Sequence, residues 1–274
     1  MMIHERNKKL WEHMKSDCSK CSGLCCIALF FSKIDGFPID KAPGQPCINL
    51  LKDYRCKIHS QLEKQKMKGC IGYDCFGAGQ HVTQVIYQGQ TWNDIPNQSM
   101  EIFDVFIIVF QLYQIRYYLT EATSLISAKP LKKSIQCLID ENIKMCHYRP
   151  KDILSLDLEQ YRNKSNHILK QVCKLLQQSI HSENKKGLAN FPGGNFKGQD
   201  MSGADLSTKL LIAANFENSL FNGTIFLGAD TRDTNFDDAD LSEAVFLTQG
   251  QVNSAKGNRN TKLPYQLEYP STWK

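Results

Sequence analysis

Between residues 191 and 246 a large apolar residue recurs at every fifth position, a spacing that neither an α-helix nor a regular strand produces. A small residue lies two positions before most of them, and in an extended backbone residues two apart point the same way. Each pair would therefore face one interior, and a turn must follow each unit. The large positions are Phe191, Phe196, Met201, Leu206, Leu211, Phe216, Phe221, Phe226, Thr231, Phe236, Leu241 and Phe246.

A chain that bends every five residues with one face inward winds into a coil, and stacked coils bury their large side chains in columns. If four units make one square coil, one column would hold Phe196, Phe216 and Phe236. Thr231 is the polar exception, and its buried hydroxyl would need a backbone partner. Two longer side chains stand at small positions, Gln199 and Lys209, and we expect them to distort the first coil or to leave it through a corner.

The repeated unit is a small residue, Asp or Asn, Leu or Phe, and two polar residues, as in Ala204-Asp205-Leu206-Ser207-Thr208. This pattern resembles the pentapeptide-repeat family. The resemblance implies a short right-handed quadrilateral β-helix of about three coils over residues 187–248. Residues 249–274 would form a C-terminal cap and tail, beginning with a short capped helix at 248–257.

A second pattern is a cluster of cysteines between residues 18 and 75, which opens with a C-x2-C-x3-C-C knot. A C-x2-C step lets two sulfurs from one turn approach a single ion. The region is rich in glycine and has no long apolar element, so a bound metal would stabilise it. We predict that residues 1–80 form a metal-binding module. The candidate ligands are Cys18, Cys21, Cys25, Cys26, Cys47, Cys56, Cys70 and Cys75.

Cys25 and Cys26 are adjacent, so their side chains diverge; a binuclear site, or one structural cysteine among the eight, would accommodate this. Disulfides and simple burial of thiols as small apolar groups are the alternatives. His59, three residues after Cys56, is interpreted as a surface histidine rather than a ninth ligand. Thiolate-only sites suit zinc or, alternatively, iron or an iron-sulfur cluster.

The arrangement is similar to the cysteine-cluster family described as zinc- or iron-chelating domains. The similarity covers residues 17–79, through the knot and the later blocks around Cys47, Cys56 and Cys70. It departs where an Arg-Pro step is usual before the seventh cysteine, because residues 66–69 here read Lys-Met-Lys-Gly. The resemblance implies a metal but no reaction.

Between residues 97 and 181 the apolar residues recur at spacings of three and four, which predicts helices near 102–117, 135–145 and 152–179. Three such helices would make a small bundle within residues 81–182, and residues 182–187 read as a linker. Cys137, Cys146 and Cys173 lie on these helices and are interpreted as packing residues. The fold class expected for the whole chain is therefore α+β, with the cysteine module and the bundle followed by the β-helix.

Charge is unevenly distributed along the chain. Residues 187–246 carry three cations and nine carboxylates, about −6, although the whole chain is +5. The segment 1–17 is polar, and the most apolar run, 105–114, is shorter than the roughly 20 residues that span a bilayer. We therefore expect a cytoplasmic protein with no membrane association, in which an odd count of eleven cysteines favours metal over disulfides.

These features predict a non-enzymatic, metal-binding interaction protein whose repeat segment presents a protein-binding surface. They name neither the partner nor the oligomeric state, and we predict no catalytic or cofactor-binding residues apart from the thiols. An iron-sulfur or iron/zinc redox or catalytic protein is the first alternative. The cysteine region is basic, but it has neither a finger helix nor an aromatic-basic motif. Nucleic-acid binding is therefore not favoured.

A topoisomerase-binding DNA mimic is the second alternative, because some pentapeptide-repeat proteins resemble B-DNA in shape and charge. Length opposes it here. Three coils stacked at about 4.8 Å span roughly 15 Å, less than half of the about 34 Å turn of B-DNA.

Overall fold

The computed structural model describes residues 3–5, 7–180 and 191–273, so the predicted linker at 182–187 lies outside the described residues. The longer helices are α4 (Ser99–Ser124), α5 (Lys132–Cys146) and α7 (Leu158–Ile180). The short α-helices are α1 (Leu24–Ala28), α2 (Lys68–Ile71), α3 (Ala78–His81), α6 (Pro150–Leu154) and α8 (Gln249–Ser254). The short 3-10 turns are η1 (Lys8–Met14), η2 (Cys18–Lys20), η3 (Lys33–Asp35), η4 (His59–Gln61), η6 (Pro96–Gln98) and η7 (Ile126–Leu131), and η5 (Val82–Ile86) is a π-helical turn.

Helix α4 is the centre of the helical part, and α5, α6 and α7 pack against it. Its apolar residues are buried around most of its circumference, which suits a core helix. By length and composition, Pro96–Ser124 is the one helical stretch among the described residues that could cross a membrane; in this fold it lies mostly buried among the other helices.

The helices predicted near 102–117 and 135–145 are confirmed as α4 and α5. The third predicted segment, 152–179, is divided between α6 and α7. Helix α6 ends at Leu154, and the Asp157 carboxylate then accepts the backbone N–H of Gln160 at 2.9 Å. This side-chain cap starts a new helix at Leu158, because it satisfies one of the N–H groups that a helix leaves free at its beginning.

The expected β-helix, and with it the α+β fold class, is wrong, because the described residues contain no β-strand and no sheet. Each five-residue unit instead places two residues in a turn and one residue in isolated parallel bridges to the neighbouring turns of the coil. A chain that bends every five residues leaves no run of neighbouring residues to form a strand ladder. The described chain therefore consists of helices and a coil of turns, which we call the repeat coil (residues 191–247).

The repeat coil has the predicted register of four units per turn. Isolated bridges join Asn195 to Asn215 and Asn215 to Asn235, and the same interval of four units joins Ile225 to Val245. Each bridge is accompanied by backbone hydrogen bonds between consecutive turns of the coil, such as the N–H of Asn215 donating to the carbonyl of Gly194 at 2.8 Å. One residue in each five-residue unit thus takes part in backbone pairing, with the period that the sequence shows, and its partner lies four units away.

Large side chains stack in columns inside the coil, as predicted. The ring centroids of Phe196 and Phe216 lie 5.0 Å apart and those of Phe216 and Phe236 lie 6.0 Å apart, each pair at 16°. The hydroxyl of Thr231 donates to the backbone carbonyl of Gln251 at 2.8 Å, which confirms the expected backbone partner. The two long side chains at small positions, at residues 199 and 209, are exposed.

The chain after residue 247 closes the end of the coil. Helix α8 is the helix expected at 248–257, although it ends at Ser254. Beyond it, Lys256 and Lys262 form bridges with the last turn of the coil, at Asn235 and Asp240. Trp273 is buried against the coil, and its indole N–H donates to the carbonyl of Ala255 at 3.2 Å.

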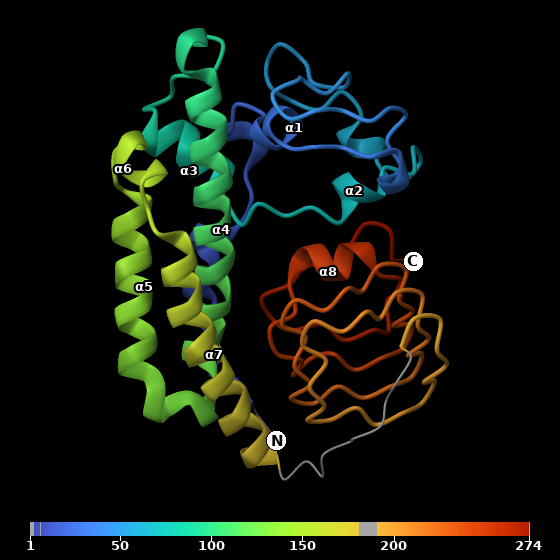
Figure 1. Ribbon diagram of the computed structural model, residues 1–274. Helices are drawn as coiled ribbons and strands as arrows, with labels where there is room; N and C mark the ends of the chain where they lie inside the picture. Colours follow the sequence, from blue (N-terminus) through green and yellow to red (C-terminus); the bar gives the residue numbers. More distant parts are fainter. Residues whose placement is uncertain (1–2, 6, 181–190, 274) are drawn as a thin grey trace.

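The parts of the molecule share one main core, beside a second core inside the coil and a small third core in the cysteine module. Figure 1 shows the coil beside α4 and α7, with α8 between the coil and α2. The main core contains helical residues, residues of the cysteine module such as Leu24 and Phe76, and Ile225 and Val245 from the coil. One side of the coil is thus covered by helices.

Candidate functional site

All eight predicted cysteine ligands are free thiols, with Cys18 exposed and the others half-buried. Short helices, turns and loops carry them, and the sulfurs of Cys25 and Cys26 lie 3.9 Å apart. Within the described residues no three His, Cys, Asp or Glu side chains meet in a group that could hold an ion. The module therefore gathers the thiols into one region, and its metal binding stays a prediction.

One group of cysteines lies where the start of the module packs on α3. Turn η2, which begins at Cys18, contacts α3. The hydroxyl of Ser16 lies 3.1 Å from the sulfur of Cys75, three residues before α3. On α3 itself, a Cβ at Gly79 would stand only 2.7 Å from the sulfur of Cys21. Only glycine, which has no Cβ, leaves room for this sulfur.

Another group lies in the loops that follow α1. The backbone N–H of Cys47 donates to the carbonyl of Cys26 at 2.9 Å, and the Cys47 sulfur accepts the N–H of Asn49 at 3.5 Å. Leu50, close after Cys47, forms a bridge with Cys56. Cys47 and Cys70 both pack against a small separate core made by Phe31, Phe37 and Met67.

Burial keeps most of these thiols protonated in the absence of a metal. The pKa of Cys21 is raised to about 11 and that of Cys70 to about 12, first by burial and then by the charges of nearby thiolates. Cys26 differs: a hydrogen bond from Cys25 lowers the pKa of Cys26 and the charge of Lys41 lowers it too, against burial, which raises it. Metal binding at these thiols would therefore release protons, and its affinity would fall as the pH falls.

Two polar side chains that sequence reasoning missed fit a thiolate-bound metal. The Tyr73 hydroxyl is buried and has no hydrogen-bond partner within the described residues. It lies near Cys25, Cys75 and Cys21, whose charges, after burial, raise the pKa of Tyr73 well above its usual range. A phenol in this position can donate to a thiolate sulfur, as partners of metal ligands commonly do.

The second missed side chain is Lys41, which is only 6% exposed. Its ammonium donates to three backbone carbonyls, those of Ile27, Ala42 and Gln45, at 2.8 to 3.1 Å. It also lies close to Cys47 and Cys26. A buried cation beside thiols offsets the negative charge of thiolates. One of many lysines gives no sign of burial in the sequence, whereas Tyr73, between two cysteines, could have been singled out.

His59 and the three cysteines of the helices lie outside these groups. His59 is exposed on η4, as a surface histidine should be. Cys146 and Cys173 are buried in the main core, which confirms their reading as packing residues. Cys137 on α5 is exposed, so the same reading is wrong for it.

The repeat coil shows different chemistry on opposite sides. On the docked side, Ile225 and Val245 are fully buried against the helices. On the side two units away, which we call the asparagine side, Asn215 donates its amide N–H to Asn195 and Asn235 donates to Asn215, both at 3.1 Å. The asparagine side therefore faces away from the helices.

Two exposed leucines flank the asparagine side. Leu210 is 55% exposed and Leu220 is 51% exposed, and each occupies the outward bridge position of a neighbouring unit. Ion pairs such as Lys197 with Glu217, at 2.9 Å, surround them. An exposed apolar residue on each flank of an ordered polar row is an arrangement found in protein-binding surfaces.

A cleft of 910 Å³ lies between α2, α4 and the end of the coil near α8. An ion pair of 2.7 Å between Lys68 on α2 and Asp233 on the coil joins its two walls. Gly250 on α8 approaches Gly72 so closely that a Cβ at Gly250 would lie 2.6 Å from the Gly72 carbonyl oxygen. The cysteine module thus contacts the coil at this cleft.

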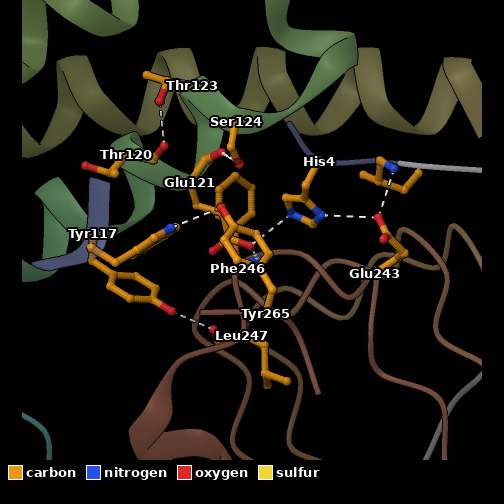
Figure 2. Close-up of polar contacts among 12 residues, drawn as sticks. His4, Tyr117, Thr120, Glu121, Thr123, Ser124, Glu243, Phe246, Leu247 and Tyr265 are labelled. Atoms are coloured by element: carbon orange, nitrogen blue, oxygen red, sulfur yellow. Dashed lines mark hydrogen bonds and ion pairs between the residues drawn. The ribbon is translucent and has the colours of Figure 1, made fainter. Parts of the chain in front are cut away.

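A buried histidine links the N-terminal segment, α4 and the coil (Figure 2). His4 is 2% exposed, and its two ring nitrogens lie 3.4 Å from carboxylate oxygens of Glu121 on α4 and Glu243 on the coil. Glu121 also accepts the backbone N–H of Phe246 at 2.9 Å. Burial lowers the pKa of His4, but the hydrogen bonds and charges of the two glutamates outweigh it and raise the pKa above 6.5. No sequence motif pointed to this contact.

Comparison with known proteins agrees with the repeat pattern. The family described as "Pentapeptide repeats" matches residues 211–246 with eight copies. A solved pentapeptide repeat protein from the Arabidopsis thaliana thylakoid lumen is 24% identical over 31% of this chain and 67% of its own, with a TM-score of 0.17. The uncharacterized protein YybG of Bacillus subtilis (strain 168) is 38% identical over 265 residues, 95% of each chain. The chain therefore belongs to one family with YybG and carries pentapeptide repeats in residues 211–246.

Proposed function

We propose that this protein is a non-enzymatic interaction protein, in which the repeat coil binds a partner protein and the cysteine module binds metal. Partner binding by the coil is supported by one observation: the coil is attached to the helices through one side only. The helices cover the side that contains Ile225 and Val245, and the opposite side is left with its asparagine row between two exposed leucines.

The exposed sides of the coil are suited to recognition because they are ordered before any partner arrives. The stacked rings of Phe196, Phe216 and Phe236 hold the backbone, and the asparagine amides bind one another. A surface that is already ordered loses little conformational entropy on binding. The leucines supply apolar area, and the amides and carboxylates around them supply specificity.

Support for the metal comes from the donor set. Eight thiols between Cys18 and Cys75, with a buried unpartnered phenol and a buried ammonium beside them, suit a soft, thiolate-bound ion. Zinc is the first choice, with iron or an iron-sulfur cluster as the alternative. When bound, the metal would cross-link loops that have only one small core of their own. Thiol ligands of this kind persist in a reducing compartment, so we also propose a cytoplasmic location.

A photo-crosslinking amino acid at Leu220 tests the proposed surface in cells. The matched control carries the same group at Ile143 on α5, which is 40% exposed. We expect a discrete protein adduct from position 220 and none of the same mass from position 143. The partner is then identified, purified and titrated against the protein, and Leu220→Asp should weaken binding by at least tenfold. Equal adducts from both positions, or unchanged affinity of the Leu220→Asp variant, would contradict the proposal.

A further inference from the structure

The segment of residues 3–5 is held between the end of α4 and the last turn of the coil. On one side, the backbone N–H of Glu5 donates to the carbonyl of Ser124 on α4 at 2.7 Å. On the other side, the backbone N–H of Ile3 donates to the carboxylate of Glu243 on the coil at 2.8 Å. Three parts of the chain that are far apart in sequence therefore meet at this segment.

His4 is the middle residue of the segment, and its imidazole lies between two carboxylates (Figure 2). Its Nε2 is 3.4 Å from Glu121 on α4, and its Nδ1 is 3.4 Å from Glu243. The His4 side chain is 2% exposed, that of Glu121 is fully buried, and that of Glu243 is 15% exposed. Water therefore screens the charges of this group only weakly.

This geometry is satisfied only when both ring nitrogens carry a proton. A neutral imidazole has one N–H, so it can donate to one carboxylate while its other nitrogen faces the second carboxylate as acceptor against acceptor. The protonated ring presents an N–H to each carboxylate and offsets their negative charge. The offset matters most for Glu121, because a buried carboxylate without a compensating charge is costly, and its Oε2 has no hydrogen-bond partner within the described residues.

We infer that His4, Glu121 and Glu243 form a proton-operated latch: the protonated His4 holds residues 3–5 between α4 and the coil, and loss of the proton releases this segment. The inference depends neither on the proposed partner nor on a bound metal. Its direction agrees with the balance of effects on His4. Burial lowers the pKa of His4, but the hydrogen bonds and charges of the two glutamates raise it by more, to above 6.5. The latch is therefore closed at lower pH and opens as the pH rises through the raised value.

Other titratable or charged side chains surround the latch: Tyr117 and Tyr118 on α4, Tyr265 in the C-terminal tail, and the exposed ion pair of Glu5 with Lys129. Burial, followed by the charge of Glu121, raises the pKa of Tyr117 well above its usual range and that of Tyr118 to about 12. Both phenols therefore stay neutral between pH 6 and pH 9, and neither competes with His4 for the proton.

Opening of the latch would change a small and definite part of the molecule. Ile3 is 3% exposed, and a Cβ at Gly223 of the coil would lie 3.4 Å from its side chain. Release of residues 3–5 would thus uncover the coil beside Gly223. The backbone N–H of Phe246, which donates to Glu121 at 2.9 Å, would lose protection at the same time. The rest of the coil keeps its own columns and backbone pairing.

Hydrogen exchange of the full chain between pH 6 and pH 9 tests the latch. Each rate is divided by the rate of the unfolded chain at the same pH, so that the intrinsic pH dependence of exchange cancels. We expect the protection of the Ile3 and Phe246 amides to fall at least tenfold over this range. The amide of Asn215, which donates to Gly194 inside the coil, should keep its protection.

Variants assign the pH dependence to His4. His4→Gln cannot take up a proton, so it should show at pH 6 the lower protection that the unchanged protein reaches only at high pH, and this value should not change with pH. Glu243→Gln should move the midpoint to lower pH, because the imidazolium loses one of its two negative neighbours. The matched control is His167→Gln, an exposed position on α7, which should behave as the unchanged protein.

A second measurement covers the case in which His4→Gln folds poorly. Titration of the His4 ring nitrogens by NMR in the unchanged protein should give a midpoint above pH 6.5 that coincides with the midpoint of the loss of protection. A midpoint below 6.5, or two midpoints that differ, would overturn the latch. So would protection that does not vary with pH, a pH dependence that persists in His4→Gln, or an equal loss at Asn215, which would indicate general unfolding.

Discussion

Small residues in the repeat do more than leave room for the large ones. Where the small residue carries a hydroxyl, it donates to a carbonyl of the preceding turn of the coil: Ser219 to Phe196 at 2.9 Å, and Thr224 to Met201 at 2.7 Å. The period alone indicated size at these positions, not hydrogen bonding. The hydrogen bond between stacked turns explains why Ser and Thr occur at these small positions.

Truncation of the central ring tests the column of aromatic residues. Phe216 is fully buried between Phe196 and Phe236, so Phe216→Ala should lower the free energy of unfolding by about 3–5 kcal/mol. Denaturant unfolding followed by fluorescence and circular dichroism measures the change. Leu220→Ala, at an exposed position of the same coil, should cost well under about 1 kcal/mol. Similar losses for the two variants would argue against a stacked core.

His4 should make stability depend on pH in a defined direction. Its pKa is raised in the folded protein, so its contribution is complete below about pH 6.5 and is lost as the pH rises through the raised value. Glu121 and Glu243 face its ring nitrogens, and the ring of Tyr265 lies beside it. The difference in unfolding free energy between the unchanged protein and His4→Gln should therefore shrink between about pH 6 and pH 9. A difference that is constant over this range would contradict this role.

At the scale of elements, the periodicity of apolar residues predicted those elements whose place in the chain a local pattern determines. The apolar spacing located α4 and α5, and the five-residue period located the coil and its four-unit register. The short helices of the cysteine module were not predicted, because contacts with distant segments hold them, as with α3 against η2. The α+β class was wrong because turns interrupt every unit before a strand can form.

The cap of α8 provides a test at this scale. The Thr248 hydroxyl accepts the backbone N–H of Gln251 at 3.2 Å, while the Gln251 side chain accepts the N–H of Thr248 at 2.8 Å. Thr248→Ala should reduce the unfolding free energy by about 1 kcal/mol, because the beginning of α8 loses its side-chain acceptor. The control is Ser207→Ala, which removes a hydroxyl on the coil surface. Equal stability of Thr248→Ala and the unchanged protein in denaturant would contradict the assignment.

At the scale of the whole molecule, the side of the coil that meets the helices could have been foreseen. Most outward bridge positions hold Asn or Asp, but positions 225 and 245, four units apart on one side, hold Ile and Val. Two apolar residues that repeat on one side indicate a covered side, whereas the single leucines at 210 and 220 share their sides with Asp and are exposed. The buried glutamate of α4 and its histidine partner could not be foreseen, because Glu121 and His4 come from segments far apart in the chain.

Removal of metal should loosen one part of the molecule and leave another intact. The cysteine module has only a small core of its own, whereas the coil is held by its own columns and hydrogen bonds. After chelation, backbone hydrogen exchange should accelerate in residues 17–75, and residues 191–247 should keep their protection. The same treatment of Cys137→Ser serves as the control. Exchange that is unaltered by chelation throughout the module would count against a structural metal.

The contact of a single side of the coil with the helices restricts how the family can change in length. Loss of one five-residue unit would turn every later unit by a quarter of a revolution, and Val245 would then point away from α4. Loss or gain of four units together would preserve the alignment. Lineages of this protein should therefore lengthen or shorten in whole revolutions, so that insertions and deletions between relatives come in multiples of four units.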